Sequence, residues 1–237
     1  GLIINILNKF VLSLFFVNLF SQNSSLVSEA KTLPNIDGEV INDEAWEGIS
    51  AIKTFTQKSP DEGTLSTEQT IVKIMYSEET FYVSVVCYDS EPNKIVITDT
   101  RRDAPLNNTD SFMFVLDTYQ DQQNGFVFGT NAGGIEYDAQ VSGGGEGMSI
   151  SSTRQSVGIG ANFNINWDAA WEVKTKIGDF GWSAEFAIPF KTLRFSSKKN
   201  QTWGANFQRT IARRSEHVFW SPIPRQFSLN RLALAGI

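Results

Sequence analysis

Short runs in which apolar and polar residues alternate recur along the chain, and turn residues separate them. In a β-strand successive side chains point to opposite faces, so a period of two places every second residue in a core. The turns at 77–79 and 178–180 are short enough to close antiparallel hairpins. The clearest strand predictions are therefore residues 70–76 (TIVKIMY), 80–89 (TFYVSVVCYD), 170–176 (AWEVKTK) and 181–188 (GWSAEFAI).

A second kind of run is apolar almost throughout. Residues 110–117 (DSFMFVLD) and 125–131 (GFVFGTN) flank a polar turn and predict a further strand pair, whereas 143–166 predict a long loop. Helical periodicity is confined to one turn that Asn42 or Asp43 caps and to residues 190–195. The pattern predicts an all-β fold, a two-sheet antiparallel β-sandwich with one or two short helical turns.

The first residues are typical of a secretory signal peptide. Lys9 precedes an apolar run at 10–20 (FVLSLFFVNLF), which is shorter than the roughly 20 residues a spanning helix needs, and Ser21 stands where cleavage would fall. A short amphipathic or buried helix is the alternative. Cys87 is the single cysteine, so no intrachain disulfide is expected. These features predict an exported protein of a Gram-negative envelope, in the periplasm, the outer membrane or at the cell surface.

The domain boundaries follow from the same pattern. We expect a signal peptide at 1–22, a loose segment at 23–32 and one sandwich at 33–227. Residues 228–237 end in an apolar LALAGI run. We expect that segment to begin a further C-terminal region, such as a β-barrel.

Charge is divided unevenly along the chain. Residues 22–189 hold 10 basic and 25 acidic residues, and residues 190–237 hold 9 basic and 1 acidic residue. An acidic body argues against nucleic acid as a partner. The basic C-terminal strands are expected to pair with that body, and a solvated surface is the alternative.

Residues 203–220 (WGANFQRTIARRSEHVFW) hold the densest chemistry in the sequence. At a strand's period of two, Trp203, Phe207, Arg209 and Arg213 share one face. Guanidinium groups on such a face need partners, because an unpaired buried charge is very costly. The stretch is either a ligand groove or a core strand neutralised by acids from elsewhere, and the second interpretation predicts an ion-pair core of Glu185, Arg209, Arg213 and Glu216.

Ordered motifs from about residue 33 onward resemble the carbohydrate-binding module family 9-like domain, in the form that precedes an outer-membrane β-barrel in Bacteroidota proteins. The motifs include IDG at 36–38, DEAW at 43–46, RRD at 101–103, WE at 171–172, GW at 181–182 and WG at 203–204. The resemblance implies a β-sandwich that acts in glycan recognition or carbohydrate catabolism as part of a larger envelope protein. Its partners would be a glycan or the protein's own barrel, for which it would be a docking or plug domain.

The sugar contacts of that family are not kept at the matching positions. Such modules stack a sugar between tryptophans and hold its hydroxyls with charged side chains. In this sequence the position of the first tryptophan falls within 106–109, and that of a glutamate is Met113. The position of an arginine lies near Gly129, and that of the last tryptophan lies near Gln226 or Phe227. The resemblance therefore supports the fold more than sugar binding.

Four aromatic residues in loops or at strand ends are the candidates for ligand contact, since recognition residues concentrate there. The alternative is that they pack the long loop onto the sheet. They are Tyr119, Tyr137, Phe163 and Trp167.

Calcium is the cofactor that the resemblance suggests. A hard cation needs several oxygen ligands, which short carboxylates and loop carbonyls supply. Asp89, Asp110, Asp117 and Asp121 could provide them. The alternative is that these aspartates cap turns.

Catalysis has weaker support. Glu172 and Glu185 lie on neighbouring predicted strands and could form the carboxylate pair of a glycosidase, but neutralisation of Arg209 or Arg213 by Glu185 is the favoured alternative. Any glycosidase activity is expected in an attached domain. Nucleophile and phosphate motifs are absent, and Cys87 is expected in the core.

The resemblance also suggests haem as a ligand, because distantly related sandwiches can hold haem through a methionine and a histidine. The single histidine, His217, would act with Met75, Met113 or Met148. A histidine at a strand edge that bonds to a neighbour is the favoured alternative.

Overall fold

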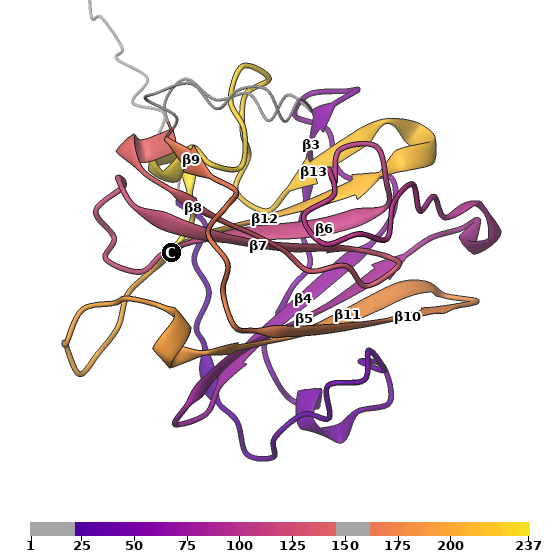
Figure 1. The fold of residues 1–237 in the computed structure, drawn as a ribbon. Coiled ribbons are helices and arrows are strands. Elements are labelled where there is room, and N and C mark those ends of the chain that lie inside the picture. The colour runs from indigo at the N-terminus through magenta and orange to yellow at the C-terminus, as the bar shows by residue number, and fades with distance from the viewer. Residues whose placement is uncertain (1–21, 146–161) are drawn as a thin grey trace, which may run out of the picture.

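Two largely antiparallel β-sheets stack face to face in the computed structural model, which describes residues 22–145 and 162–237 (Figure 1). The apolar run at 10–20 and Met148 lie outside these residues. The predicted β-sandwich is confirmed, and the helical content of the described residues is limited to single 3₁₀ turns.

The first sheet, sheet A, has the order β1-β4-β5-β11-β10. The short strand β2 also pairs with β4, at Val72 and Lys73. All its pairs are antiparallel except β1 with β4. The four strands predicted from alternation form most of this sheet, with β4 and β5 as one hairpin and β11 and the edge strand β10 as the other. The bounds are β1 Ser28–Glu29, β2 Ala51–Ile52, β4 Thr70–Tyr76, β5 Thr80–Tyr88, β10 Glu172–Gly178 and β11 Gly181–Pro189.

The second sheet, sheet B, has the order β3-β13-β12-β6-β7-β8-β9 and is antiparallel throughout. The predicted pair of β6 and β7 lies at its centre. The strands β3, β8 and β9 were not predicted, and β9 falls within the loop expected at 143–166. The bounds are β3 Thr56–Ser59, β6 Ser111–Asp117, β7 Gly125–Asn131, β8 Tyr137–Val141, β9 Phe163–Asn164, β12 Gly204–Ile211 and β13 Glu216–Phe219.

Short 3₁₀ turns join the strands. In η1 the Asp43 side chain accepts from the Ala45 amide and Trp46 is buried, as the sequence predicts. η4 begins at Phe190, where the second helical turn was expected. The turns are η1 Glu44–Trp46, η2 Pro92–Lys94, η3 Gly143–Gly145, η4 Phe190–Thr192, η5 Ala212–Arg214 and η6 Leu232–Leu234.

Apolar side chains fill three layers. Alternate residues of β5 (Phe81, Val83, Val85 and Cys87) join Phe112, Phe114 and Leu116 of β6 between the sheets. The other residues of β6, Met113 and Val115, lie in a cluster on the outer face of sheet B, so both faces of this strand are covered. This explains its unbroken apolar sequence. A third cluster around Trp46 covers the outer face of sheet A.

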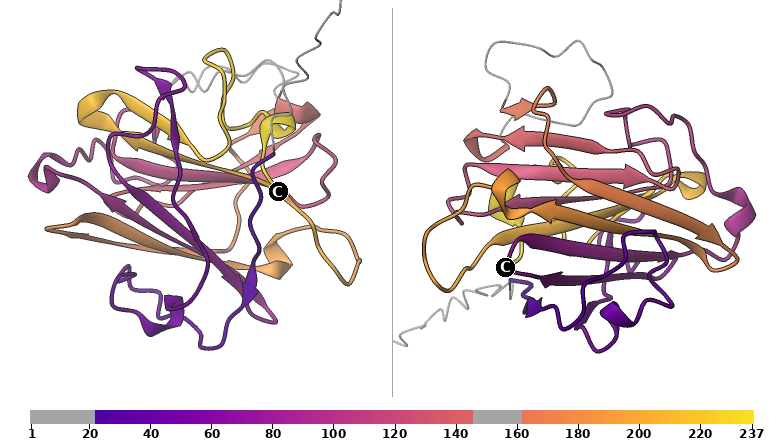
Figure 2. Two further views of the ribbon diagram at one scale, coloured as in Figure 1. Left: turned by 180° about the vertical axis from the view of Figure 1, so that it is seen from behind. Right: turned by 60° about the horizontal axis from the view of Figure 1, so that its bottom comes forward.

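The expected boundaries of the sandwich need correction at both ends. Residues 23–32 were expected to be loose, but β1 pairs with β4 and the Ser25 amide donates to the Ile237 carbonyl at 2.8 Å. Residues 228–237 were assigned to a further region, but Leu229, Leu232 and Ala235 are buried against the sandwich. Both segments are held largely by backbone hydrogen bonds, which side-chain periodicity does not report (Figure 2). In the described part of the chain, no helix has the length and hydropathy that a membrane span requires.

Candidate ligand-binding site

The outer face of sheet B brings together the positions at which the family resemblance places sugar contacts. A Cβ atom added at Gly129 would lie 2.9 Å from Leu106 Cδ1 and 2.9 Å from Met113 Cγ. Leu106 and Met113 are buried, and Phe227 packs against the same apolar cluster. The matching positions therefore converge as expected, but apolar side chains occupy the place of the tryptophan, glutamate and arginine.

The chain itself covers this face. Ile223, Leu229 and Leu232, which follow β13, are buried in the cluster, and Lys58 Nζ donates to the Phe227 carbonyl. Leu106, Met113 and Gly129 therefore offer a sugar neither an exposed aromatic face nor a polar side chain. The outer face of sheet B is thus a second core.

The four aromatic candidates do not form one site. Tyr137 is buried and Phe163 packs beside it in the outer cluster of sheet B. Trp167 lies on the other side of the sheet, with its ring centroid 5.1 Å from that of Phe126 and 6.0 Å from that of Phe128. Only Tyr119 of the four is largely exposed, at 51%. Tyr137 is a buried strand residue, and Phe163 and Trp167 pack against the two faces of sheet B.

The four aspartates proposed for calcium separate into two pairs at opposite ends of β6. Asp117 accepts from the amides of Asp121 and Gln122, and Asp121 accepts from those of Gln123 and Asn124. These carboxylate oxygens accept the backbone hydrogen bonds that close the turn, so their arrangement does not fit a cation site.

The other pair, Asp89 and Asp110, lies at the start of β6. Asp89 accepts from Arg213 and Asp110 accepts from the Val96 amide. Among the residues that the structure describes, no group of three or more carboxylate, histidine or cysteine side chains is arranged for a metal ion.

The expected pairing of Arg209 and Arg213 with Glu185 and Glu216 is wrong. Arg209 is fully buried, as predicted, but its guanidinium donates to the carbonyls of Gln69 and Tyr88 at 3.0 and 2.7 Å and to the Thr70 hydroxyl. β12 ends at Ile211, so the chain turns before Arg213 and carries it to the end of β5. There Arg213 binds Glu68, Asp89 and Glu91 at 2.6, 2.6 and 2.9 Å.

The two glutamates bind other groups. Glu216 accepts from the amide and hydroxyl of Thr67 at 2.9 and 2.7 Å. Glu185 points to the outer face of sheet A, because its neighbours Ala184 and Phe186 occupy the inner face. It accepts from Trp46 Nε1 at 2.7 Å and from the Gly38 amide at 2.9 Å.

This arrangement removes the proposed carboxylate pair. Glu172 is exposed on β10, whereas Glu185 is fully buried on β11 and occupied by its donors. Burial also raises the pKa of Glu185, although the hydrogen bonds from Trp46 and Gly38 oppose that shift. A buried carboxylate of this kind is a structural group rather than a group that reaches a substrate.

His217 hydrogen-bonds to a neighbouring strand, as expected, but β13 lies between β3 and β12 and not at the edge of the sheet. His217 Nδ1 lies 3.1 Å from the Thr210 hydroxyl, and burial lowers the pKa of the histidine. Met75 and Met113 lie in the outer clusters of sheets A and B. Met75 therefore lies on a different sheet from His217, whereas Met113 and His217 both lie on the outer face of sheet B.

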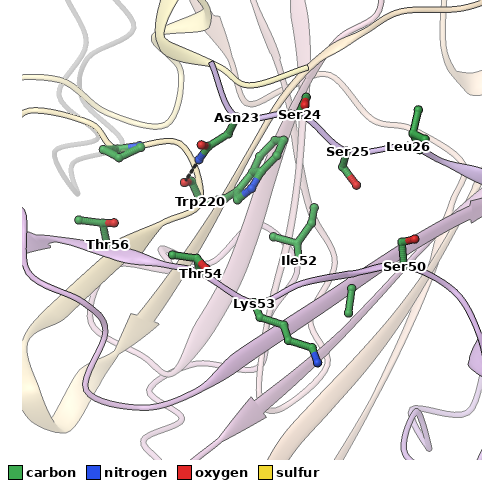
Figure 3. A pocket seen from close by; sticks show the side chains of 12 residues that line it. Asn23, Ser24, Ser25, Leu26, Ser50, Ile52, Lys53, Thr54, Thr56 and Trp220 are labelled. Atoms are coloured by element: carbon green, nitrogen blue, oxygen red, sulfur yellow. Dashed lines mark hydrogen bonds between the residues drawn. The ribbon is translucent and has the colours of Figure 1, made fainter. Parts of the chain in front are cut away.

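An open cavity of about 630 Å³ lies at the edge where the chain crosses from sheet A to sheet B. Its walls are the N-terminal segment 23–26 and the segment 50–56, which links β2 to β3 (Figure 3). Trp220 and Ile52 supply apolar surface, and Asn23 ties the N-terminal wall to the end of β13 by donating to the Trp220 carbonyl. The lining residues are Asn23, Ser24, Ser25, Leu26, Ser50, Ala51, Ile52, Lys53, Thr54, Thr56, Trp220 and Pro222.

The cavity combines hydroxyl and amide groups, one ammonium group and an indole. Its volume falls in the range of small-molecule sites, which commonly hold a few polar groups over an apolar floor. Sequence reasoning missed it, because three segments far apart in the chain form it. Trp220, at the end of the dense 203–220 stretch, was the one local signal.

Comparison with known proteins agrees with this architecture. Residues 36–216 match the family model described as carbohydrate family 9 binding domain-like. No protein with a curated description matches the sequence.

Two solved structures share the fold. A proposed carbohydrate-binding protein of Bacteroides uniformis ATCC 8492 has a TM-score of 0.65 at 13% identity, covering 91% of this chain and 98% of its own. A family 9 carbohydrate-binding module of Caldicellulosiruptor kristjanssonii, solved with cellotriose, has a TM-score of 0.52 at 19% identity, covering 88% and 87%.

Proposed function

The chain belongs to the carbohydrate family 9 binding domain-like family, and we propose that it works as a non-catalytic module that binds a glycan. The observation that carries this proposal is the open cavity beside Trp220, which holds hydrogen-bonding groups over an apolar floor. The filled outer face of sheet B leaves that position without the groups that a sugar requires. The proposed site is therefore the edge cavity.

The side chains of the cavity suit a sugar. Hydroxyls of Ser24, Ser50 and Thr54 can both donate to and accept from sugar hydroxyls, and Lys53 can donate to ring or hydroxyl oxygens. The apolar surface of Ile52 and Trp220 matches the CH groups of a pyranose ring. Orientation would come from the polar rim and contact area from the floor.

Blocking the cavity tests the proposal. Thr54 is exposed on the rim, so Thr54→Trp should fill the cavity without disturbing the core, and Lys53→Ala should remove one donor. Calorimetry against a panel of neutral oligosaccharides that includes cellotriose should show at least about tenfold weaker binding for the first variant and a smaller loss for the second.

Lys94→Ala is the matched control, because Lys94 is an exposed lysine outside the cavity. Its affinity should equal that of the unmodified chain. Absence of binding across the panel would reject glycan recognition. Full binding by Thr54→Trp would instead reject the cavity as its site.

We also propose that the protein is exported. The charged, apolar and small-residue pattern of residues 1–22 supports this. Cleavage just before Asn23 would keep the hydrogen bond between the Asn23 side chain and the Trp220 carbonyl. The intact mass of protein recovered from the periplasm of a Gram-negative host should correspond to that cleavage, and an uncleaved cytoplasmic product would contradict it.

A further inference from the structure

A basic loop, residues 190–203, projects from one end of the sandwich between β11 and β12 (Figures 1 and 2). It holds four basic residues and no acidic residue. All four side chains are exposed, and none of them forms an ion pair within the described part of the chain. The four are Lys191, Arg194, Lys198 and Lys199.

These residues differ from the other basic residues of the C-terminal part. Arg213, Arg214 and Arg225 pair with carboxylates of the acidic body, as the sequence analysis expects for this region. The loop cations are exposed and have no carboxylate partner among the described residues. Their positive charge is therefore available to a ligand.

Hydrogen bonds hold the loop in one shape. Gln201 Nε2 donates to the Ser196 carbonyl at 2.8 Å and also to the Lys198 carbonyl, and Gln201 Oε1 accepts from Trp203 Nε1. The Thr118 hydroxyl donates to the Arg194 carbonyl and ties the loop to the end of β6. Such internal bonds reduce the ordering cost of binding.

Aromatic rings lie among the cations. Phe195 is 36% exposed, and its ring centroid is 5.6 Å from that of Phe190 and 5.8 Å from that of Trp203. Trp203 in turn packs on Phe81 at 5.4 Å, which anchors the group to the core. Tyr119, which is 51% exposed, directly follows Thr118 and so lies beside the same loop.

We propose that the basic loop is the contact surface for an anionic glycan, one whose sugars carry carboxylate or sulfate groups. Arg194 and the three lysines would bind the anionic groups, because Arg and Lys form charge-assisted hydrogen bonds with both. Phe195 and Tyr119 would pack against the CH faces of the sugar rings. The inference rests on the glycan-binding role proposed above and names a ligand class and a second surface.

The charge of the rest of the molecule favours binding of an anionic ligand at the loop. Residues 22–189 hold 25 acidic residues, so a polyanion is repelled from most of the body and directed to the loop. Exposed acids border the loop: the Phe190 amide donates to the Glu79 carbonyl, the Thr192 hydroxyl donates to the Ala170 carbonyl between Asp168 and Glu172, and Asp121 lies beyond Tyr119. These acids limit the length of glycan chain that the loop can hold.

The experiment compares anionic glycans with an uncharged glycan, and dextran sulfate and dextran share the same backbone. Dextran sulfate and polygalacturonate, with uncharged dextran as reference, are titrated into the purified chain, and anionic phospholipid vesicles form a separate arm. The proposal predicts binding to at least one anionic glycan and none to dextran at the loop. Raising salt from about 0.05 M to about 0.5 M should weaken that binding at least tenfold, because exposed charges are screened.

Two loop variants and one control locate the binding. Lys198→Glu with Lys199→Glu should lower the affinity at least tenfold, and Phe195→Ser should lower it severalfold even at high salt. Lys94→Glu with Arg101→Glu changes the net charge equally at the opposite end of the sandwich, where both residues are exposed, and should have little effect.

The outcomes separate the two proposals. If neutral oligosaccharides bind and Thr54→Trp abolishes their binding while the loop variants have no effect on any anionic glycan, the loop proposal fails and the cavity proposal stands. If no glycan of either kind binds, both fail. Preference for vesicles over glycans, or an equal loss in the control pair, would overturn the loop proposal.

Discussion

Arg213 shows how one residue holds an end of the sandwich. Its side chain is 12% exposed and binds Glu68 and Asp89, whose side chains are 9% and 1% exposed, together with Glu91. Burial by itself would raise the pKa of Asp89, but hydrogen bonds from Arg213 and from the Glu91 amide hold that pKa below its usual range. The ionised carboxylate therefore contributes stability that depends on Arg213.

Arg213→Ala should lower the free energy of unfolding by about 2 kcal/mol or more, because it leaves buried carboxylates without their partner. Chemical denaturation at neutral pH measures this. Arg214→Ala is the control, since Arg214 is 38% exposed and makes one contact to Glu68, and it should cost less than about 1 kcal/mol. Equal losses in the two variants would contradict the assignment.

The lowered pKa of Asp89 makes the stability of the fold depend on pH. A carboxyl group whose pKa is depressed by folding contributes stability at pH values above its unfolded pKa and loses it as pH falls through the folded pKa. The unmodified chain should therefore lose stability on acidification below the usual carboxyl range. Arg213→Ala should show a smaller loss over the same range.

Residue patterns predicted where Arg209 lies but not what it binds. Alternation placed it on the inner face of a strand, and it is fully buried. Its partners are backbone carbonyls of Gln69 and Tyr88, which every residue possesses, so no pattern of acidic residues could identify them. Glu185 was a poor choice for the same reason, because its donors are an indole and backbone amides.

At the scale of elements, Glu185 joins the N-terminal segment to sheet A. One carboxylate oxygen accepts from Trp46 Nε1 and the other from the amides of Asp37 and Gly38. The Ser183 hydroxyl adds a bond to the Gly38 carbonyl. Residues 35–46 are thereby fixed over the outer face of the sheet.

Glu185→Gln should destabilise the fold by about 1 to 2 kcal/mol at neutral pH, because an amide has one acceptor oxygen where two are used. Burial raises the pKa of Glu185, so its contribution is greatest at low pH and is lost as pH rises through the folded pKa. The free energy of unfolding of Glu185→Gln should not fall over this pH range. Thermal unfolding across the weakly acidic range measures both effects.

Glu172→Gln is the companion variant, since Glu172 is an exposed carboxylate on the neighbouring strand. It should change the stability by less than about 0.5 kcal/mol. A similar effect in the two variants would show that Glu185 has no special structural role.

The elements differ in how far the sequence predicts them. β4, β5, β10 and β11 alternate clearly, and their turns are short, so their pairing follows from local rules. β8 was missed because Asp138 interrupts its apolar pattern. That buried carboxylate accepts hydrogen bonds from Arg102, the Ala169 amide and Trp171, which lie far away in the sequence. β1 and residues 228–237 depend on backbone pairing with distant segments.

For the described residues as a whole, apolar clusters cover both outer faces of the sandwich, and the cavity lies at one edge. The C-terminal residues pass between the two proposed surfaces, since Gly236 bridges Ala205 next to Trp203 and also packs against Trp220. The cavity beside Trp220 and the basic loop thus flank the same C-terminal residues. From the uneven charge we expected the basic C-terminal part to pair with the acidic body, which Arg213, Arg214 and Arg225 do, whereas the unpaired loop and the cavity required the folded chain.

Amide and indole chemical shifts on titration with cellotriose and with an oligogalacturonate test the central claim, that glycans bind at this edge. We predict perturbation of residues 50–56 and the Trp220 indole by the first, or of residues 190–203 and the Trp203 indole by the second. Leu106, Met113 and Gly129 should not shift. Perturbation centred on those three residues, or no perturbation by either glycan, would contradict the account.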